Sequence, residues 1–202
     1  GKPFFGMIFD PKATGPDPND LRGGFRAPRR FVGWQTFFDF GDGQVKPNKR
    51  IDTRISTPLF DLPLGAIANH APPVVLPVRT LLRHITWELP SGQAIARKMG
   101  VSALAPADLD ELHRYGLGLE RSTPLWYYVL KEAELIEDGL RLGPVGGRLV
   151  GEVIVGLLES DPAAYLAYER DWRPTLPSRS RGDFRMVDFL TFAGVDPKSR
   201  GQ

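Results

Sequence analysis

The second half of the chain alternates apolar runs with helix start and stop signals. The run from Val78 to Trp87 is apolar with Arg79 and Arg83 interspersed, which is typical of an amphipathic helix. Ser91 is a favoured N-cap residue and Gly100 a favoured stop, so they predict a helix between them. The same signals predict helices at 78–87, 92–99, 107–115, 125–137, 145–158 and 162–169, and a last helix after Asp183, which we expect to cap it.

The first part of the chain differs in composition and in its pattern of apolar residues. Eleven of the 19 prolines lie in residues 1–80, where turn sequences such as Gly41-Asp42-Gly43 separate extended segments. Only Trp34, Phe37 and Phe38 have helical spacing there. We therefore expect a mainly α fold with little or no β structure. It would be one domain, with residues 1–77 as an irregular arm that wraps a partner surface and residues 78–202 as a helical core.

The segment from Val145 to Leu158 is apolar nearly all round, which predicts a helix at the centre of the core. Gly147 and Gly151 would let another helix approach closely. Glu152 is the exception on this helix, and a buried carboxylate needs a partner. Two arrangements are open: Glu152 lies at the helix edge, in water or paired with Arg148, or it pairs with an arginine from another segment.

Composition excludes several classes of site. The chain has 202 residues, 42% of them apolar, and a net charge of +2, which favours neither a polyanion nor an acidic substrate. Without cysteine there is no disulfide or thiolate site. No apolar run approaches the roughly 18 residues of a spanning helix. The start shows neither a signal-peptide layout nor a methionine, so we expect a processed or excised piece.

Other candidate motifs are weak. The three histidines, His70, His84 and His113, share no ligand spacing, so we expect no metal site. An arginine-rich stretch in the arm is flanked by aspartates and is more typical of a solvated loop than of a nucleic-acid contact. Its arginines are Arg22, Arg26, Arg29 and Arg30. Glycines 143, 146 and 147 are followed by no Lys-Ser/Thr, unlike a phosphate loop.

Five stretches in register carry a family resemblance. They read GWQTFFDF with RIDTRISTPLFDLP, LPVRTLLRHITWELPSGQ, TPLWYYVLKEAE, GLRLGPVGGRLVGEVIVGLLESDP, and GDFRMVDFLTFAGVDP. In this order the chain resembles the animal-type haem peroxidase superfamily, in its bacterial branch, from about Met7 to Pro197. The resemblance implies the C-terminal portion of a peroxidase catalytic domain. The iron ligands and the calcium loop would belong to an N-terminal portion or a companion chain.

The resemblance also implies a cofactor and residues that approach it. The family binds haem b and uses hydrogen peroxide to oxidise a small donor. Arg83 matches the family's arginine beside a haem propionate, and Thr80 stands where the family has an asparagine that contacts the proximal histidine. Leu76, just before the predicted helix 78–87, and Arg79, within it, complete the expected cofactor-binding set. This chain alone would be inactive, with no catalytic residue of its own.

Alternatives remain open from the residues themselves. Thr80 and the divergent stretch from His84 to Glu88 also fit a non-catalytic helical interaction module on a degenerate peroxidase scaffold. Arg83 has its own alternative, an ion pair with Glu152 or another acidic side chain. The compartment is not indicated, although members of the family are often secreted or cell-associated. We expect no nucleic acid partner and no transmembrane segment.

Overall fold

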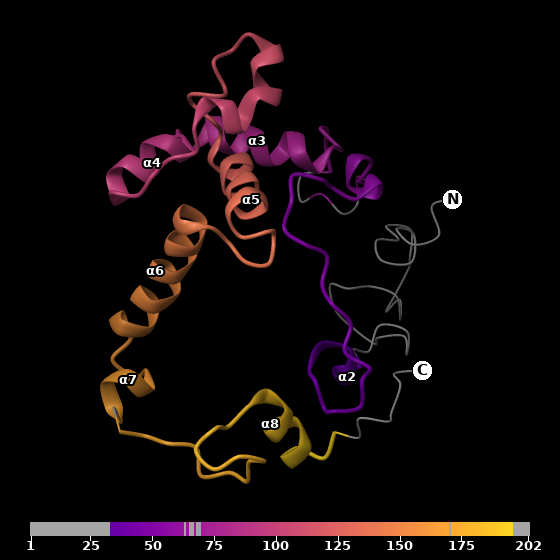
Figure 1. Cartoon of the computed structure of the whole chain (residues 1–202), viewed down its shortest axis with the longest axis vertical. Coiled ribbons are helices and arrows are strands. Elements are labelled where there is room, and N and C mark those ends of the chain that lie inside the picture. Colours follow the sequence, from indigo (N-terminus) through magenta and orange to yellow (C-terminus); the bar gives the residue numbers. More distant parts are fainter. Residues whose placement is uncertain (1–32, 63, 65–66, 68–69, 170, 196–202) are drawn as a thin grey trace. The chain divides into compact units, whose positions relative to one another are not determined.

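The computed structural model describes residues 33–62, 64, 67, 70–169 and 171–195. This part of the chain is mainly helical and contains no strand, apart from an isolated bridge between Ser180 and Asp183 (Figure 1). It divides into two compact units. One comprises Lys49–Ser160, and the other combines the segments before and after it. This division differs from the boundary at residue 77 that the sequence predicts.

The helices begin and end close to the predicted signals. Within 49–160 they are η2 (Thr57–Phe60), α3 (Leu76–Thr86), α4 (Gly92–Met99), η4 (Pro106–Tyr115), α5 (Leu125–Ile136) and α6 (Pro144–Ser160). The other unit holds α2 (Trp34–Phe37), α7 (Tyr165–Tyr168) and α8 (Met186–Phe192). The fold class is therefore confirmed as mainly α. The arginine-rich stretch of the arm lies outside the described residues.

Three helix predictions need correction. Residues 107–115 lie within the 3₁₀ helix η4, which is broken at Leu109 by a φ of −126°. Only Tyr165–Tyr168 is helical in the predicted 162–169 segment, because the Asp161 carboxylate turns the chain by accepting a hydrogen bond from the Ala163 N–H. Asp183 does not cap α8, since its carboxylate binds the Arg185 side chain instead.

The α4 helix forms as its sequence predicts. The Ser91 hydroxyl accepts a hydrogen bond from the Ala94 N–H at 3.2 Å, and Gly100 adopts a left-handed φ of 70° that ends the helix. Gly92 follows the cap directly. A Cβ placed on Gly92 would lie 1.9 Å from the ring of Tyr128, so only glycine lets α4 approach α5 this closely.

The core of the 49–160 unit is built around Tyr128. This side chain is fully buried, and its hydroxyl accepts a hydrogen bond from the Leu104 N–H at 2.9 Å. It thereby ties α5 to the segment between α4 and η4, while satisfying its own polar end. The buried apolar residues around it come from α4, η4, α6 and the segment between α4 and η4. They are Ala96, Leu104, Leu109, Leu112 and Val145.

A buried amide joins the start of α4 to the loop before α5. The Gln93 side chain donates to the Thr123 hydroxyl at 2.8 Å and accepts from the Thr123 N–H at 2.9 Å. The Thr123 hydroxyl in turn donates to the Leu119 carbonyl. Because both buried polar side chains have partners, this network costs little and fixes how the two segments meet.

A buried carboxylate sets the corner between α5 and α6. Glu132 is fully buried on α5, and its two oxygens accept hydrogen bonds from the N–H groups of Val145 and Gly146 at 3.0–3.1 Å. These N–H groups lie in the first turn of α6, where backbone N–H groups have no carbonyl acceptor within the helix. Gly143 leaves the room, since a Cβ there would lie 2.5 Å from the Glu132 Cγ. Glu132 thus acts as a cap supplied by another helix.

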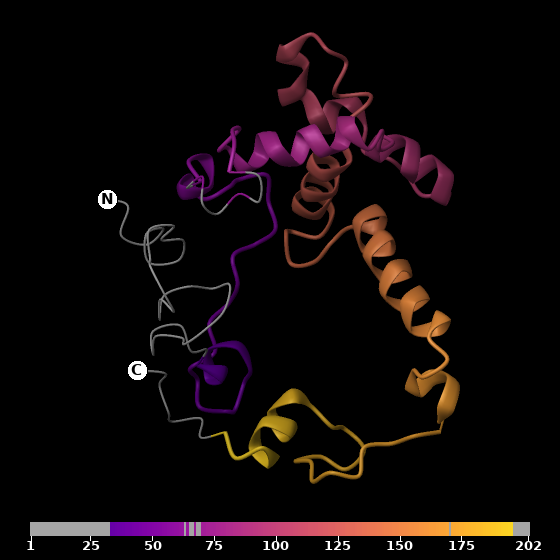
Figure 2. The ribbon, with the colours of Figure 1, turned by 180° about the vertical axis from the view of Figure 1, so that it is seen from behind.

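The expectation that α6 lies at the centre of a core is wrong for the described residues. Only Val145 and Gly146 of this helix are buried, and they belong to its first turn. Further along, large apolar side chains such as Val153 and Leu157 are at least 60% exposed. In Figures 1 and 2, no other helix of the 49–160 unit runs alongside the C-terminal half of α6. The apolar sequence of α6 does form a helix, but among the described residues only its first turn is buried.

The other unit has a small core at α8. Phe40, Val187 and Leu190 are buried together, with Phe38 and Val195 packed on them. Asp188, on α8, accepts hydrogen bonds from the backbone N–H groups of Arg179 and Arg185, both at 2.9 Å. These bonds lower the pKa of Asp188, the Arg185 bond being the stronger influence. Asp188, rather than the predicted Asp183, is therefore the acidic residue that holds the start of α8.

Replacing Asp188 by alanine is expected to loosen α8. The N–H groups of Arg179 and Arg185 would lose their acceptor, so amide exchange in residues 186–192 should become roughly five- to tenfold faster. Because folding lowers the pKa of Asp188, the wild-type helix should lose the same protection as the pH falls below about 4. Hydrogen exchange read by mass spectrometry measures both effects. Asp183→Ala is the control, and comparable loosening there would contradict the assignment.

Candidate functional site

The cofactor-binding residues predicted from the sequence all lie on α3. Leu76, Thr80 and Arg83 are spaced by four and then three residues, so they share one face of the helix. Arg79 lies beside that face. The helix begins after Val75, with Pro77 in its first turn, where a missing N–H costs nothing. The local sequence therefore brings the four predicted residues together on a single element.

Arg79 has a structural role in this arrangement. Its guanidinium donates hydrogen bonds to the carbonyl oxygens of Pro73 at 3.1 Å and Ala71 at 3.4 Å. These contacts tie the loop before α3 to the helix itself. Because the guanidinium is engaged with its own chain, Arg79 orients α3 rather than offering a free cation.

Thr80 uses its hydroxyl hydrogen inside the helix. The hydroxyl donates to the Leu76 carbonyl at 3.2 Å, the common bond of a helical threonine with the preceding turn. The oxygen keeps its lone pairs, so toward any ligand Thr80 can act as an acceptor. Both Thr80 and Leu76 are half-buried.

Arg83 is the free cation of α3. Its side chain is exposed, and its guanidinium forms no hydrogen bond or ion pair within the described part of the chain. The suggested pair with Glu152 is not formed, because Glu152 accepts a hydrogen bond from Arg148 one turn earlier on α6. The simpler alternative for Glu152, an exposed pair at the helix edge, is therefore confirmed. Arg83 can still bind a carboxylate from outside the described residues.

The opposite side of α3 is an exposed apolar stripe. Its members follow helical spacing and are each at least 36% exposed: Val78, Leu81, Leu82 and Ile85. No residue of α3 is buried, although the helix packs on η2 and α5. A helix with an uncovered apolar stripe is typical of a surface that another segment covers.

Comparisons with known proteins identify no relative. No family model, curated protein or solved structure matches this chain. Among the described helices, none is both long and apolar enough to cross a bilayer.

The three histidines lie apart. The His70 ring nitrogen is 3.2 Å from the Leu64 carbonyl, and His113 lies 3.8 Å from the Glu120 carboxylate. On α3, the Nδ1 atom of His84 is buried without a hydrogen-bond partner in the described residues. The described residues contain no group of three or more histidine or acidic side chains that could hold a metal.

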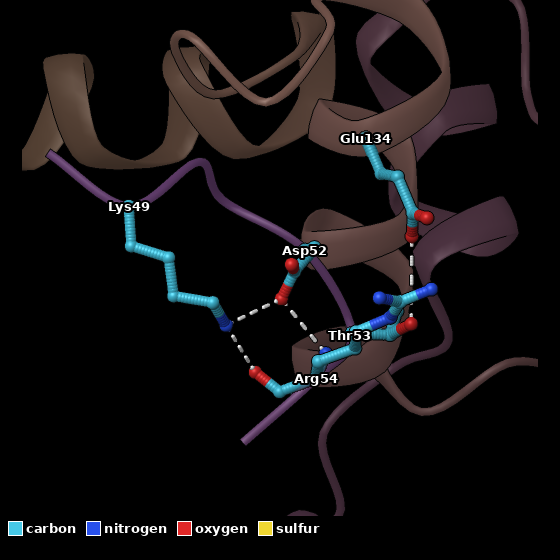
Figure 3. A network of polar contacts seen from close by, with 5 residues as sticks. All are labelled: Lys49, Asp52, Thr53, Arg54 and Glu134. Atoms are coloured by element: carbon cyan, nitrogen blue, oxygen red, sulfur yellow. Dashed lines mark hydrogen bonds and ion pairs between the residues drawn. The ribbon is translucent and has the colours of Figure 1, made fainter. Parts of the chain in front are cut away.

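A polar network joins the segment before η2 to α5 (Figure 3). The Lys49 amino group donates to the Asp52 carboxylate and to the Arg54 carbonyl, both at 2.9 Å. The same carboxylate accepts from the Arg54 N–H. Next to them, the Thr53 hydroxyl donates to Glu134 of α5 at 3.4 Å. The Lys49 bond lowers the pKa of Asp52, so the network is a set of fixed charges that shapes the loop.

A second titratable group lies along α5. The Tyr127 hydroxyl donates to Glu111 of η4 at 2.8 Å, and the Lys131 amino group lies 3.1 Å from the same carboxylate. Burial and the Glu111 bond raise the pKa of Tyr127, so its hydroxyl stays protonated. Burial pushes the pKa of Glu111 upward, but its hydrogen bonds and Lys131 hold it below the ordinary value. Neither group has its pKa moved toward neutrality, as a general acid or base would need.

This group was not predicted from the sequence, although one signal was present. Tyr127 and Lys131 are four residues apart on a helix, so both reach the same side. Their partner Glu111 comes from the 3₁₀ helix η4, and the sequence does not show that η4 lies against α5. The arrangement joins η4 to α5 and gives the unit a fixed tertiary contact.

An open cavity of 320 Å³ lies beside α8 in the other unit. The charged groups around it already have partners. Arg179 donates to the Phe40 carbonyl, Arg185 binds Asp183, and Asp39 accepts from the Gly41 N–H. Because these charges are satisfied within the chain, the cavity offers no free group to recognise a ligand.

Proposed function

We propose that this chain is the C-terminal scaffold portion of a haem peroxidase-like oxidoreductase. Haem b would be carried by, or shared with, an N-terminal portion of the same enzyme or a companion chain. That portion would also supply the iron ligands, as the resemblance to the family implies. The bound haem would supply the peroxide-dependent oxidation of a small donor.

The observation that carries this proposal is Arg83. An arginine that has no partner among the described residues, exposed beside Thr80, is suited to a carboxylate such as a haem propionate. Arg79 would hold α3 in position through the Ala71 and Pro73 carbonyls. Thr80 would accept a hydrogen bond from an N–H of the partner portion. The apolar stripe of α3 would pack on that portion and exclude water.

A direct test is the absorption spectrum of the native assembly that contains this chain. We expect a Soret band and an assembly mass well above 22.4 kDa. Arg83→Ala should weaken haem retention, with haem loss about tenfold faster or more. Arg97→Ala is the matched control, because Arg97 is an exposed arginine of the neighbouring α4. Full haem occupancy with an unshifted band in the Arg83→Ala assembly would overturn the role of Arg83.

A second candidate is a non-catalytic helical interaction module on a degenerate peroxidase scaffold. The exposed apolar stripe of α3 favours it, since such a surface serves a protein partner without any cofactor. The same spectrum separates the two. An assembly of high mass without a Soret band supports the interaction module and contradicts the enzyme.

A further inference from the structure

The C-terminal half of α6 has a contact face that its own unit leaves bare. Val150, Ile154, Leu157 and Leu158 are each at least 40% exposed and are spaced to lie on one side of the helix. Val153 and Val155 extend the apolar surface at its edges. Isolated apolar side chains on a surface are ordinary, but a continuous helical face of them is typical of an interface.

Two glycines share this contact face. Gly147 and Gly151 lie one turn apart and on the same side as Ile154 and Leu158. A Cβ on Gly151 would meet no atom within 4 Å, and one on Gly147 would make only ordinary van der Waals contacts. Glycine lowers helix propensity, and nothing in the described chain needs the space at Gly151. The pair leaves a notch on the helix beside two large side chains.

We infer that a second copy of this chain covers the face, with its α6 antiparallel to the first. A two-fold axis between residues 152 and 153 places Gly151 of one copy opposite Ile154 of the other. The same axis places Gly147 opposite Leu158, because both pairs are centred on the same point. Each large side chain then enters a glycine notch of the other copy. The contact face is therefore complementary to itself, as a closed two-fold dimer requires.

Charge and area agree with this occupant. Arg148 and Glu152 form an ion pair on α6, so they bring no unpaired charge to the edge of the contact face. The exposed apolar surface covers one side of a single helix, so it is smaller than the roughly 800 Å² that each partner contributes to a standard interface. We expect a weak dimer, with a dissociation constant on the order of 10 µM. It uses α6, not α3, so it stands independently of the proposed enzyme function.

Sedimentation equilibrium of the full chain tests the dimer. The mass should rise from 22.4 kDa toward twice that value with concentration. Gly151→Leu should raise the dissociation constant at least tenfold, because the new side chain meets Ile154 of the second copy. Gly156→Leu is the matched control, since Gly156 also has open space but faces the other side of α6. Its dissociation constant should stay within twofold of wild type, with helicity unchanged in both variants.

The absence of cysteine allows a second measurement. In an Ile154→Cys variant, a short bis-maleimide can only join two copies, and the linking rate should exceed that of Gly156→Cys at least tenfold. A monomer at all concentrations up to about ten times the expected dissociation constant would overturn the proposal. Equal effects of leucine at 151 and 156, or equal linking rates, would overturn it as well.

Discussion

Replacing Gly92 by alanine is expected to destabilise the 49–160 unit by about 3 kcal/mol or more. The added methyl group would overlap the ring of Tyr128, whose Cγ lies 1.9 Å from the Cβ position. The ring has no room to move, because it is fully buried and its hydroxyl holds the Leu104 N–H. Relief requires α4 to shift away from α5, which would also strain the Gln93–Thr123 bonds next to it.

Urea unfolding followed by tryptophan fluorescence measures this loss. Gly156→Ala is the control, because Gly156 lies in α6 with no atom within 4 Å of its Cβ position. There, alanine should stabilise the helix by up to about 1 kcal/mol. If Gly92→Ala matched or exceeded the stability of the wild-type chain, the close approach of α4 and α5 would be refuted.

The elements that the sequence predicted well are those whose signals are local. Ser91 and Gly100 lie at the ends of α4, and the bonds they make involve residues within one turn. The bounds of α5 and α6 follow in the same way from Pro124 and Pro144. Such signals depend on neighbouring residues in the chain, so one sequence is enough to find them.

The tertiary contacts could not be predicted in this way. Glu132 and Gln93 are polar residues on amphipathic helices, and the sequence does not reveal that each is buried against a segment far along the chain. For α6, hydrophobicity predicted the helix correctly but not what covers it. An apolar helix face indicates that something must cover it, but not which segment does so. For this reason the predicted central position of α6 was wrong for the described residues.

The predicted cofactor-binding residues likewise show that the sequence indicates local structure but not tertiary contacts. The predicted helix 78–87 contains Thr80 and Arg83, but Leu76 shares their face only because α3 begins two residues earlier. The carbonyl partners of Arg79 and the choice of Glu152 between two arginines depend on three-dimensional distances, which spacing does not give. The role of Arg83 with haem stays a prediction, because its partner would lie outside the described residues.

A pH-dependent loss is expected from the buried cap at Glu132. Burial raises the pKa of this carboxyl above its ordinary value, although the N–H groups of Gly146 and Val145 partly oppose the shift. The folded chain therefore retains a proton that the unfolded chain releases above about pH 4.3. Stability should fall as the pH rises from there to the raised pKa of the folded state. Glu132→Gln removes the titration, so this part of the pH dependence should vanish.

Glu132→Ala is expected to be far more damaging than Glu132→Gln. Alanine leaves the N–H groups of Val145 and Gly146 buried without an acceptor and opens a cavity between α5 and α6, at a cost of about 3–5 kcal/mol. Glutamine keeps one oxygen toward the same N–H groups and nearly the same volume, so its cost should be about 1–2 kcal/mol. Denaturant unfolding of both variants at pH 4.5 and pH 7 measures the difference. Equal losses for the two would contradict the cap hypothesis, because that hypothesis requires that an acceptor oxygen rescue most of the stability.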